Sequence, residues 1–309
     1  MGWKTLRDAL LLLVLGLALA AAPVLADDND NDEEESKAPE EPTLLWKVEG
    51  KDHYVWIYGS VHALTEDHYP LPKAVEEAFE ASRHLVVETD ILNIDPQVQQ
   101  ELVVNKAMLP ADTSLKEVMR EEDFERARVL MEELGYNIDE LEGVRPWFIA
   151  LTITVSELQQ LGYTEEHGIE TYFLERAADK GKSVHELESF REQLALFDGF
   201  SDEVQSRFLL QSLEEAKDLE PEVERLIDAW EEGDLDTLSE LLKESFKDYP
   251  ELYERIIVER NRAWIPKIEE FLEREHEQNY FVVVGGLHLV GEDSVIKMLE
   301  DLGYEPRRH

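Results

Sequence analysis

The 309-residue sequence predicts an α/β fold, a single domain with a central sheet formed by distant segments and a large helical middle region. Strand-like runs lie near both ends of the chain, and the stretch between them, from about residue 95 to 278, is mostly helical in its periodicity. Two of the strand-like runs also end in the same order of residues, Gly-x-x-His, which closes at His62 and at His288. We therefore expect segments far apart in the chain to meet in one sheet.

Residues 1–26 are expected to precede the folded part as a secretory signal peptide. Lys4 and Arg7 stand before an apolar run, Ala9 to Ala22, and small residues end at Ala26, which is the pattern a signal peptidase reads. The apolar run is shorter than the roughly 20 residues of a spanning helix. An uncleaved N-terminal anchor is the alternative. We expect an exported protein, periplasmic or extracellular, with no stable membrane span after cleavage of the signal.

Residues 27–42 are expected to form an acidic disordered linker, because nine acidic residues and one lysine leave too little apolar surface to fold. The folded domain is expected at residues 43–309. The formal net charge of −41 excludes nucleic acid and disfavours anionic membranes as partners. Because the chain has no cysteine, it has no disulfide, thiolate ligand or cysteine nucleophile, and any metal must be held by His, Asp or Glu. The oligomeric state is not predicted.

Short patterns predict the elements of the first hundred residues. Leu44–Val48 and His53–Tyr58 are rich in aromatic and β-branched residues and flank a turn containing Gly50, which predicts two strands. Val75–Ser82 has helical spacing, and Leu85–Glu88 is apolar enough to be a buried strand that ends in a carboxylate.

The helical middle region is expected to break at glycine and proline. Short strands are expected at Ser183–Leu187 and Tyr280–Val284, and a closing helix at Ser294–Leu302. The breaks between helices are expected near Pro110, Gly135, Gly143, Gly162, Gly181, Gly199, Gly233 and Pro250.

Polar side chains follow three of the predicted strands, His62 and His288 in the two Gly-x-x-His motifs and Glu88 after the buried strand. Ligands bind outside the carboxyl ends of strands in open α/β sheets, and a glycine there lets backbone approach a ligand. Two imidazoles and a carboxylate are ligands that divalent transition metals prefer, and a bound metal lowers the pKa of water to about 7. Each residue taken alone also fits a structural role, as a turn residue or as the partner of a surface base.

The sequence resembles the TraB/GumN family of bacteria, which is related to the Tiki proteases of animals. The similarity extends from about Thr43 to Pro306 and implies an α/β fold with paired Gly-x-x-His motifs. For the Tiki branch it implies metal-dependent proteolysis, with His62, Glu88 and His288 at the matching positions; His167 is not part of the pattern. The motifs that carry the resemblance are, in order, Leu45-Trp46-Lys47-Val48, Gly59-Ser60-Val61-His62, Val87-Glu88-Thr89-Asp90-Ile91, Gly168-Ile169-Glu170, Glu186-Leu187-Glu188 with Gln193-Leu194, Glu259-Arg260-Asn261, and Val284-Gly285-Gly286-Leu287-His288-Leu289.

Four further residues are candidates for the site. Glu170 opens a predicted helix at residues 168–180, where the helix dipole also favours an acid. Glu188 follows a strand and is a candidate ligand or general base. Arg260 and Asn261 lie in a charged helix whose side chains are expected to be solvated, and the resemblance makes them candidate substrate or oxyanion groups. The remaining histidines are expected at the surface: His53, His68, His84, His276 and His309.

The leading prediction is an exported metal-dependent hydrolase, a peptidase acting on peptides or proteins. A divalent ion, Mn, Co or Zn, is held by His62, Glu88 and His288, and Glu188 or Glu170 moves the proton. One alternative is a non-catalytic protein that binds a peptide or signalling molecule in the same cleft, and another is a metal-free hydrolase that uses a His and Glu pair. The sequence contains no Gly-x-Ser-x-Gly elbow and no phosphate-binding glycine loop.

Overall fold

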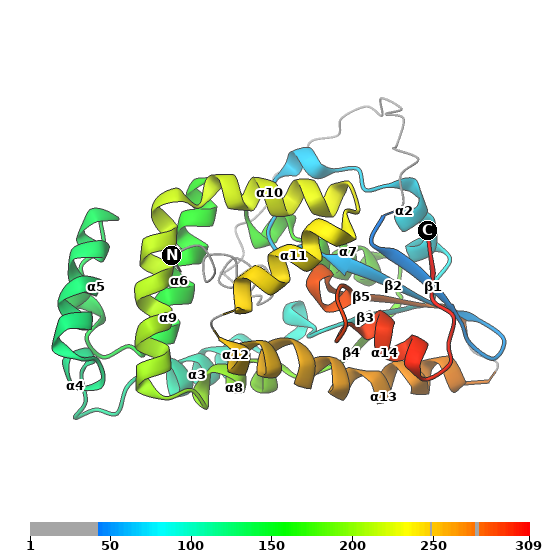
Figure 1. Ribbon diagram of the computed structural model, residues 1–309. Helices are drawn as coiled ribbons and strands as arrows, with labels where there is room; N and C mark the ends of the chain where they lie inside the picture. The colour runs from blue at the N-terminus through cyan, green and yellow to red at the C-terminus, as the bar shows by residue number, and fades with distance from the viewer. Residues whose placement is uncertain (1–42, 248, 276–277) are drawn as a thin grey trace.

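The computed structural model describes residues 43–309 except 248, 276 and 277. The predicted signal peptide and acidic linker, residues 1–42, lie outside the described residues. The described chain contains one six-stranded mixed sheet in the order β4-β3-β5-β2-β1-β6, with helices around it (Figure 1). The prediction of an α/β fold with a sheet built from distant segments is confirmed.

Four neighbouring strands of the sheet, from the edge strand β4 to β2, are parallel. Strand β5 (Tyr280–Gly285) pairs with β2 (Tyr54–Ser60) on one side and with β3 (His84–Val87) on the other, and β3 pairs with β4 (Ser183–Glu186). The antiparallel strand β1 (Leu45–Glu49) lies next to β2. Every residue of β5 is buried, which explains its continuous apolar sequence, because parallel strands are covered on both faces.

The two Gly-x-x-His motifs lie side by side, because β2 and β5 are neighbours with Ser60 opposite Gly285. A Cβ atom on Gly59 would lie 2.9 Å from the Cα of Gly286, so glycine allows the two strand ends to approach this closely. The short strand β6 (Arg307–Arg308) pairs with β1 and was not predicted, since two residues carry no periodic pattern.

Helices cover both faces of the sheet. The side chain of Phe281 on β5 contacts Phe79 of α2 (Lys73–Glu80) and Phe173 of α7 (Ile169–Asp179). Its neighbour Tyr280 points to the other face and stacks on Phe271 of α13. Helix α13 (Glu259–Glu273) lies on this second face together with the closing helix α14 (Val295–Asp301) (Figure 1).

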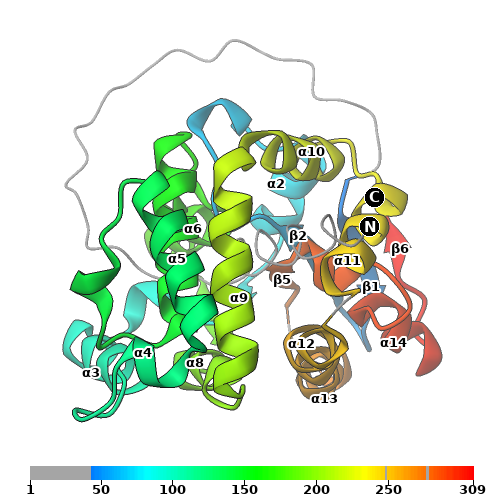
Figure 2. The same ribbon diagram turned by 60° about the vertical axis from the view of Figure 1, so that its left-hand side comes forward.

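The middle of the chain forms a second group of helices beside the sheet (Figures 1 and 2). Helix α6 (Pro146–Gln160) packs against α9 (Asp202–Glu215), which also contacts α5 (Glu121–Glu133). Most of the helix ends fall at the predicted breaks, and Gly135, Gly162, Gly181 and Gly233 have positive φ there. The other helices are α3 (Pro96–Ala107), α4 (Leu115–Val118), α8 (Phe190–Asp198), α10 (Glu220–Glu231), α11 (Leu235–Phe246) and α12 (Pro250–Tyr253).

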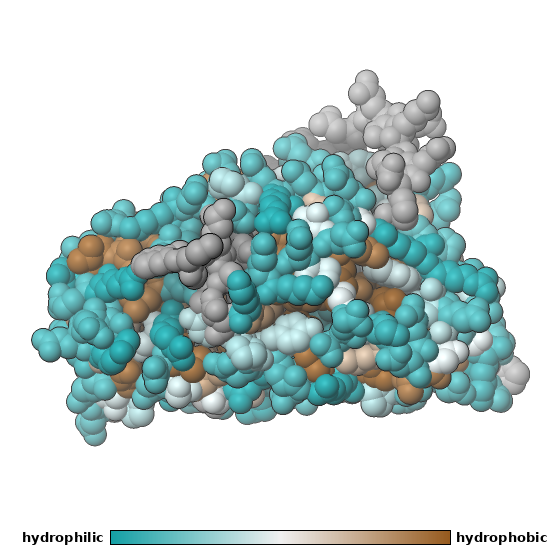
Figure 3. Space-filling model, viewed as in Figure 1, coloured by the Kyte–Doolittle hydropathy of each residue, from teal (hydrophilic) through white to brown (hydrophobic). Residues whose placement is uncertain are grey.

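The visible face of the molecule is mostly hydrophilic (Figure 3), in keeping with the net charge of −41. None of the helices in residues 43–309, as far as the structure describes them, combines the length and the hydrophobicity that crossing a bilayer requires.

Two predictions of surface positions are wrong. Arg260 and Asn261 are 4% and 0% exposed, because they lie one turn before Trp264 and Ile265 on the buried stripe of α13, which the charged composition of this helix did not indicate. His53 is also buried, since its Nε2 lies 2.9 Å from the carbonyl oxygen of Phe271. His68 and His84 are half-buried and His309 is exposed, while His276 lies outside the described residues.

Candidate active site

Each of the four parallel strands is followed by an ionisable side chain at the carboxyl edge of the sheet. His62 follows β2, Glu88 follows β3, Glu188 follows β4 and His288 follows β5. Their side chains are almost closed to solvent, at 4% exposure for His62, 3% for Glu88 and 10% for Glu188. The structure therefore brings together His62, Glu88 and His288 with the further candidate Glu188, at the edge where open sheets bind ligands.

Gly285 marks the point on which three of these side chains converge. A Cβ atom placed on Gly285 would lie 3.4 Å from His62 Nε2, 3.4 Å from Glu88 Oε1 and 3.5 Å from His288 Cδ2. The backbone N–H of Gly285 donates a hydrogen bond to Glu88 Oε1 at 2.8 Å. The first glycine of the second motif therefore leaves a small volume open between the imidazole of His62 and the carboxylate of Glu88.

Glu170 holds His62 on the side away from this volume. Its Oε2 lies 2.9 Å from His62 Nδ1, at ion-pair distance although the hydrogen-bond angle is poor, and its Oε1 accepts a hydrogen bond from the hydroxyl of Ser60. We place the imidazole proton on Nδ1, facing the carboxylate, which leaves Nε2 as the basic nitrogen. Nε2 has no hydrogen-bond partner among the described residues. Burial alone would lower the pKa of His62, but the carboxylates of Glu170 and Glu88 outweigh it and raise this pKa.

The Gly168-Ile169-Glu170 motif positions the carboxylate of Glu170. The backbone N–H of Ile169 donates to the carbonyl oxygen of Val61 at 3.1 Å, which fixes the start of α7 against the first histidine motif. A Cβ atom on Gly168 would lie 2.2 Å from the carbonyl oxygen of His62, so only glycine permits this contact. The motif thus brings a carboxylate from a distant part of the chain to His62.

Arg260 connects the two carboxylates with the second histidine. Its Nε and Nη2 donate to Glu188 and its Nη2 also donates to Glu88. Its Nη1 donates to His288 Nε2 at 3.0 Å and to the carbonyl oxygen of Ile256 at 3.4 Å. All five N–H groups of the guanidinium are directed at protein acceptors. Burial opposes the charge of Arg260, but the carboxylates of Glu88 and Glu188 outweigh burial and raise the pKa of Arg260. Because every N–H group already has an acceptor, a substrate oxyanion can bind to Arg260 only by displacing one of these contacts.

Asn261 fixes the second histidine. Its Oδ1 lies 2.6 Å from His288 Nδ1, and its Nδ2 donates to the carbonyl oxygen of Asp293 at 2.8 Å. Burial and the positive charge of Arg260 hold the pKa of His288 well below its usual range, so the ring is neutral. Nδ1 then donates to Asn261 while Nε2 accepts from Arg260. Both nitrogens of this imidazole are used within the protein.

The directions of the lone pairs test the predicted metal site, since a metal ion needs several of them aimed at one point. His62 Nε2 and Glu88 Oε1 face the volume beside Gly285, but His288 presents a carbon atom there and its Nε2 accepts from Arg260. Within the part of the chain that the structure describes, no group of three or more His, Asp or Glu side chains is arranged to hold a metal ion. The predicted His/Glu/His ligand set therefore does not fit a metal ion in this arrangement, and Mn, Co or Zn binding stays a prediction.

Two more side chains complete the cluster. Trp264 is fully buried; its Nε1 donates to Glu188 Oε2 at 3.2 Å and its ring lies 4.7 Å from the guanidinium of Arg260. The Nε2 of Gln193 lies 3.4 Å from Glu88 Oε2. Gln193 belongs to one of the motifs that carried the resemblance, whereas the only signal for Trp264 in the sequence is its i,i+4 spacing from Arg260 on a helix.

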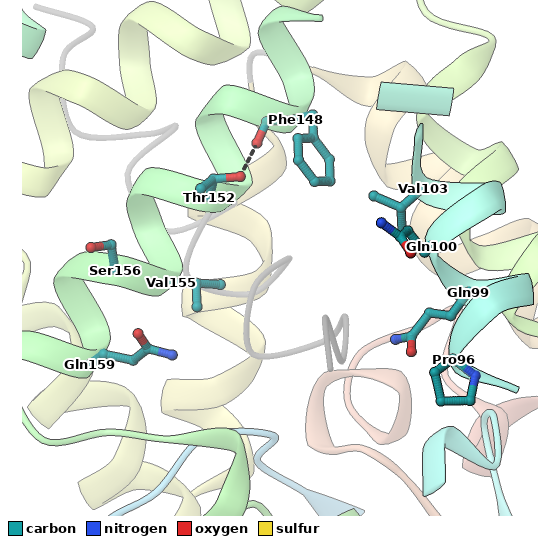
Figure 4. A pocket seen from close by; sticks show the side chains of 9 residues that line it. All are labelled: Pro96, Gln99, Gln100, Val103, Phe148, Thr152, Val155, Ser156 and Gln159. Carbon is teal, nitrogen blue, oxygen red and sulfur yellow. Dashed lines mark hydrogen bonds between the residues drawn. The ribbon is translucent and has the colours of Figure 1, made fainter. Parts of the chain in front are cut away.

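A separate cavity of about 430 Å³ lies between α3 and α6 (Figure 4). It contains none of the site residues, and its lining carries amide, hydroxyl and apolar groups but no ionisable one. It therefore lacks a group that could accept or donate the proton of a hydrolytic reaction. The lining residues are Pro96, Gln99, Gln100, Val103, Phe148, Thr152, Val155, Ser156 and Gln159.

Comparison with known proteins gives matches along nearly the whole described chain. The model of the TraB/PrgY/gumN family matches residues 44–308. The chain is 26% identical over 272 residues to a protein of Escherichia coli K12 called "Uncharacterized protein YbaP", which covers 82% of this chain and 96% of that protein. A protein of the same name from Shigella flexneri matches equally. No solved structure matches.

Proposed function

The chain belongs to the TraB/PrgY/gumN family, and from this premise we propose that it is an exported hydrolase that cleaves peptides. One observation carries the proposal. His62 is buried, its Nδ1 lies against Glu170, and its unpartnered Nε2 faces the same small volume as the carboxylate of Glu88. An imidazole arranged in this way, with one nitrogen held by a carboxylate and the other directed at a cavity, is the usual general base of hydrolytic sites.

His62 moves the proton in the proposed reaction. A water molecule beside Gly285 gives its proton to His62 Nε2 while its oxygen attacks the carbonyl carbon of the peptide. The C–N bond then breaks, and His62 returns the proton to the leaving amine, so that a carboxylic acid and an amine are released. Glu170 keeps the ring oriented and stabilises the imidazolium. A positioned base of this kind contributes about 10²- to 10⁴-fold to the rate.

The remaining polar groups position the reacting ones. Arg260 pairs with both Glu88 and Glu188 and offsets part of their buried charge. It also donates to His288, which Asn261 holds from the other side. The roles predicted for Arg260 and Asn261 as oxyanion groups are less well supported than a positioning role, since their hydrogen-bonding groups already have protein partners.

A metal-dependent form of the hydrolase is the second candidate. The charge of the cluster favours it, because the three carboxyl groups of Glu88, Glu170 and Glu188 outnumber the guanidinium of Arg260 and the imidazole of His62. A buried excess of negative charge favours a bound cation. The directions of the lone pairs oppose it. Removal of metal separates the two forms.

Export is proposed from the signal-like sequence of residues 1–26. Mass measurement of the N-terminus of the protein recovered outside the cytoplasm tests it. We expect a chain that begins at Asp27, whereas a chain that still begins at residue 1 supports the membrane anchor.

Digestion of a peptide library tests the hydrolase. The full chain is treated with a chelator and compared with His62→Ala and with His53→Ala, a control in which the lost histidine is also buried but lies at the opposite end of β2. We expect the wild type and His53→Ala to cleave, and His62→Ala to lose at least about a hundredfold in rate. Equal rates for the two variants, or binding without cleavage in every case, contradict the proposal. Cleavage that is lost with chelator and returns with Mn, Co or Zn favours the metal-dependent form.

A further inference from the structure

The cluster of side chains around Gly285 contains hydrogen-bond acceptors that lack a donor. His62 Nε2 and Gln193 Oε1 are buried and have no partner among the residues that the structure describes. Glu88 Oε1 accepts one hydrogen bond, from the N–H of Gly285, whereas a carboxylate oxygen has two lone pairs. Because buried polar atoms without partners are costly, the cluster favours a ligand that donates hydrogen bonds.

The amide orientation of Gln193 follows from its neighbours. Its Nε2 faces Glu88 Oε2 at 3.4 Å, and the reversed amide would place two acceptors against each other. The helix that carries it is fixed directly before it, because Ser189 and Glu192 form a capping box at the start of α8. The free carbonyl oxygen of Gln193 therefore belongs to the same cluster as Glu88.

The ligand should also carry positive charge. The three carboxyl groups of the cluster outnumber the two groups that can carry positive charge, the guanidinium of Arg260 and the imidazole of His62, and all five N–H groups of Arg260 are already directed at the protein. The formal net charge of −41 on the chain draws cations toward it and repels anions. A primary ammonium group meets both requirements, since it has three donors and no acceptor.

We propose that the site recognises the protonated N-terminal amine of a peptide, which donates hydrogen bonds to Glu88 Oε1 and Gln193 Oε1. This inference rests on the proposed hydrolase and specifies its substrate. In a peptide the terminal nitrogen is two bonds from the first carbonyl carbon, so an ammonium at Glu88 places that carbonyl close by. Glu88 Oε1 and His62 Nε2 are each 3.4 Å from the Cβ position of Gly285, which matches such a short separation. The enzyme then removes residues from the N-terminus, and Gln193 determines this specificity.

Matched peptides with a free or an acetylated N-terminus test the inference on the full chain. We expect kcat/KM to be at least about a hundredfold higher for the free amine. We expect Gln193→Ala to raise KM for the free peptide about tenfold, the size of one lost hydrogen bond to a charged group, with kcat almost unchanged. Gln205→Ala is the matched control, because Gln205 is also buried and its Oε1 also lacks a partner, but it lies on α9 with its Nε2 bonded to Phe200.

The outcomes separate this inference from the hydrolase itself. Equal cleavage of free and acetylated peptides overturns the inference and leaves the hydrolase standing. If no peptide is cleaved, the proposed hydrolase activity is wrong, and calorimetric titration with the same two peptides then tests amine recognition by itself. Equal binding of the two peptides, or no binding, overturns the inference. If Gln193→Ala does not fold, Gln193→Met keeps the volume of the side chain without its acceptor and should show the same change in KM. Preference for the free amine should survive chelator, since no metal takes part in it.

Discussion

Replacing Arg260 by methionine removes the only guanidinium of the cluster while keeping most of the volume of the side chain. The side chains of Arg260, Glu88 and Glu188 are 4%, 3% and 10% exposed, so the variant leaves two buried carboxylates without their cation. Loss of one partner from a buried ion pair costs about 3–5 kcal/mol. We therefore expect the free energy of unfolding to fall by about that amount.

Urea unfolding followed by tryptophan fluorescence and circular dichroism measures this change, with linear extrapolation to water. Arg128→Met on α5 is the control, since Arg128 also pairs with two carboxylates, Glu125 and Glu132, but is 37% exposed. Exposed pairs of this kind contribute at most about 1 kcal/mol. If the two variants lose similar stability, Arg260 does not neutralise a buried carboxylate pair and the description of the cluster is wrong.

Three other predictions follow from the site and its supports. Glu170→Gln should fold normally and lower kcat at least about a hundredfold because the imidazole loses its oriented partner, and steady-state kinetics with an unchanged kcat would contradict this. Gly168→Ala should lower both thermal stability and activity, since its Cβ would lie 2.2 Å from the carbonyl oxygen of His62; a variant with normal melting and normal rate argues against the contact. Ser189→Ala should lower the free energy of unfolding by about 1 kcal/mol at pH 7 through loss of the helix cap. Hydrogen bonds from the backbone and hydroxyl of Ser189 hold the pKa of Glu192 below its ordinary 4.5. The stabilisation that Glu192 gives to the helix cap is therefore present above pH 4.5 and is lost as the pH falls through the lowered pKa. The difference in the free energy of unfolding between Ser189→Ala and wild type should become smaller in acid. A difference that grows as the pH falls would contradict the role of Glu192 in the cap.

The strands and their terminal residues could be predicted because local sequence determines them. A parallel strand covered on both faces is a continuous apolar run, and β3 and β5 show this pattern. The residue that follows such a run lies at the carboxyl edge whatever the rest of the fold does, so His62, Glu88 and His288 were found together. The recurrence of the Gly-x-x-His motif also indicated that distant segments meet in one sheet, although it did not show that β2 and β5 are neighbours.

The orientation of the helical residues could not be predicted in the same way. Arg260 and Asn261 were expected in solvent because their helix is rich in charged residues, but they lie on its buried stripe, one turn before Trp264 and Ile265. The contact of Glu170 with His62 depends on how α7 begins against a distant motif, which periodicity does not show. The residue types are ones that a metal ion prefers, but the contact of Arg260 with His288 Nε2 changes which lone pairs remain available, and no pattern in the sequence shows that contact.

Gly285→Ala tests the central claim most directly, that the reaction occurs in the volume between His62 and Glu88. The φ angle of −48° at Gly285 suits alanine, and the added methyl group would lie 3.4 Å from His62 Nε2 and from Glu88 Oε1, in ordinary contact. The variant should therefore unfold at wild-type or slightly higher denaturant concentration. The rate of peptide hydrolysis should fall at least about a hundredfold, because the methyl group occupies the place of the attacking water. A stable Gly285→Ala protein that hydrolyses peptides at the wild-type rate would contradict the claim.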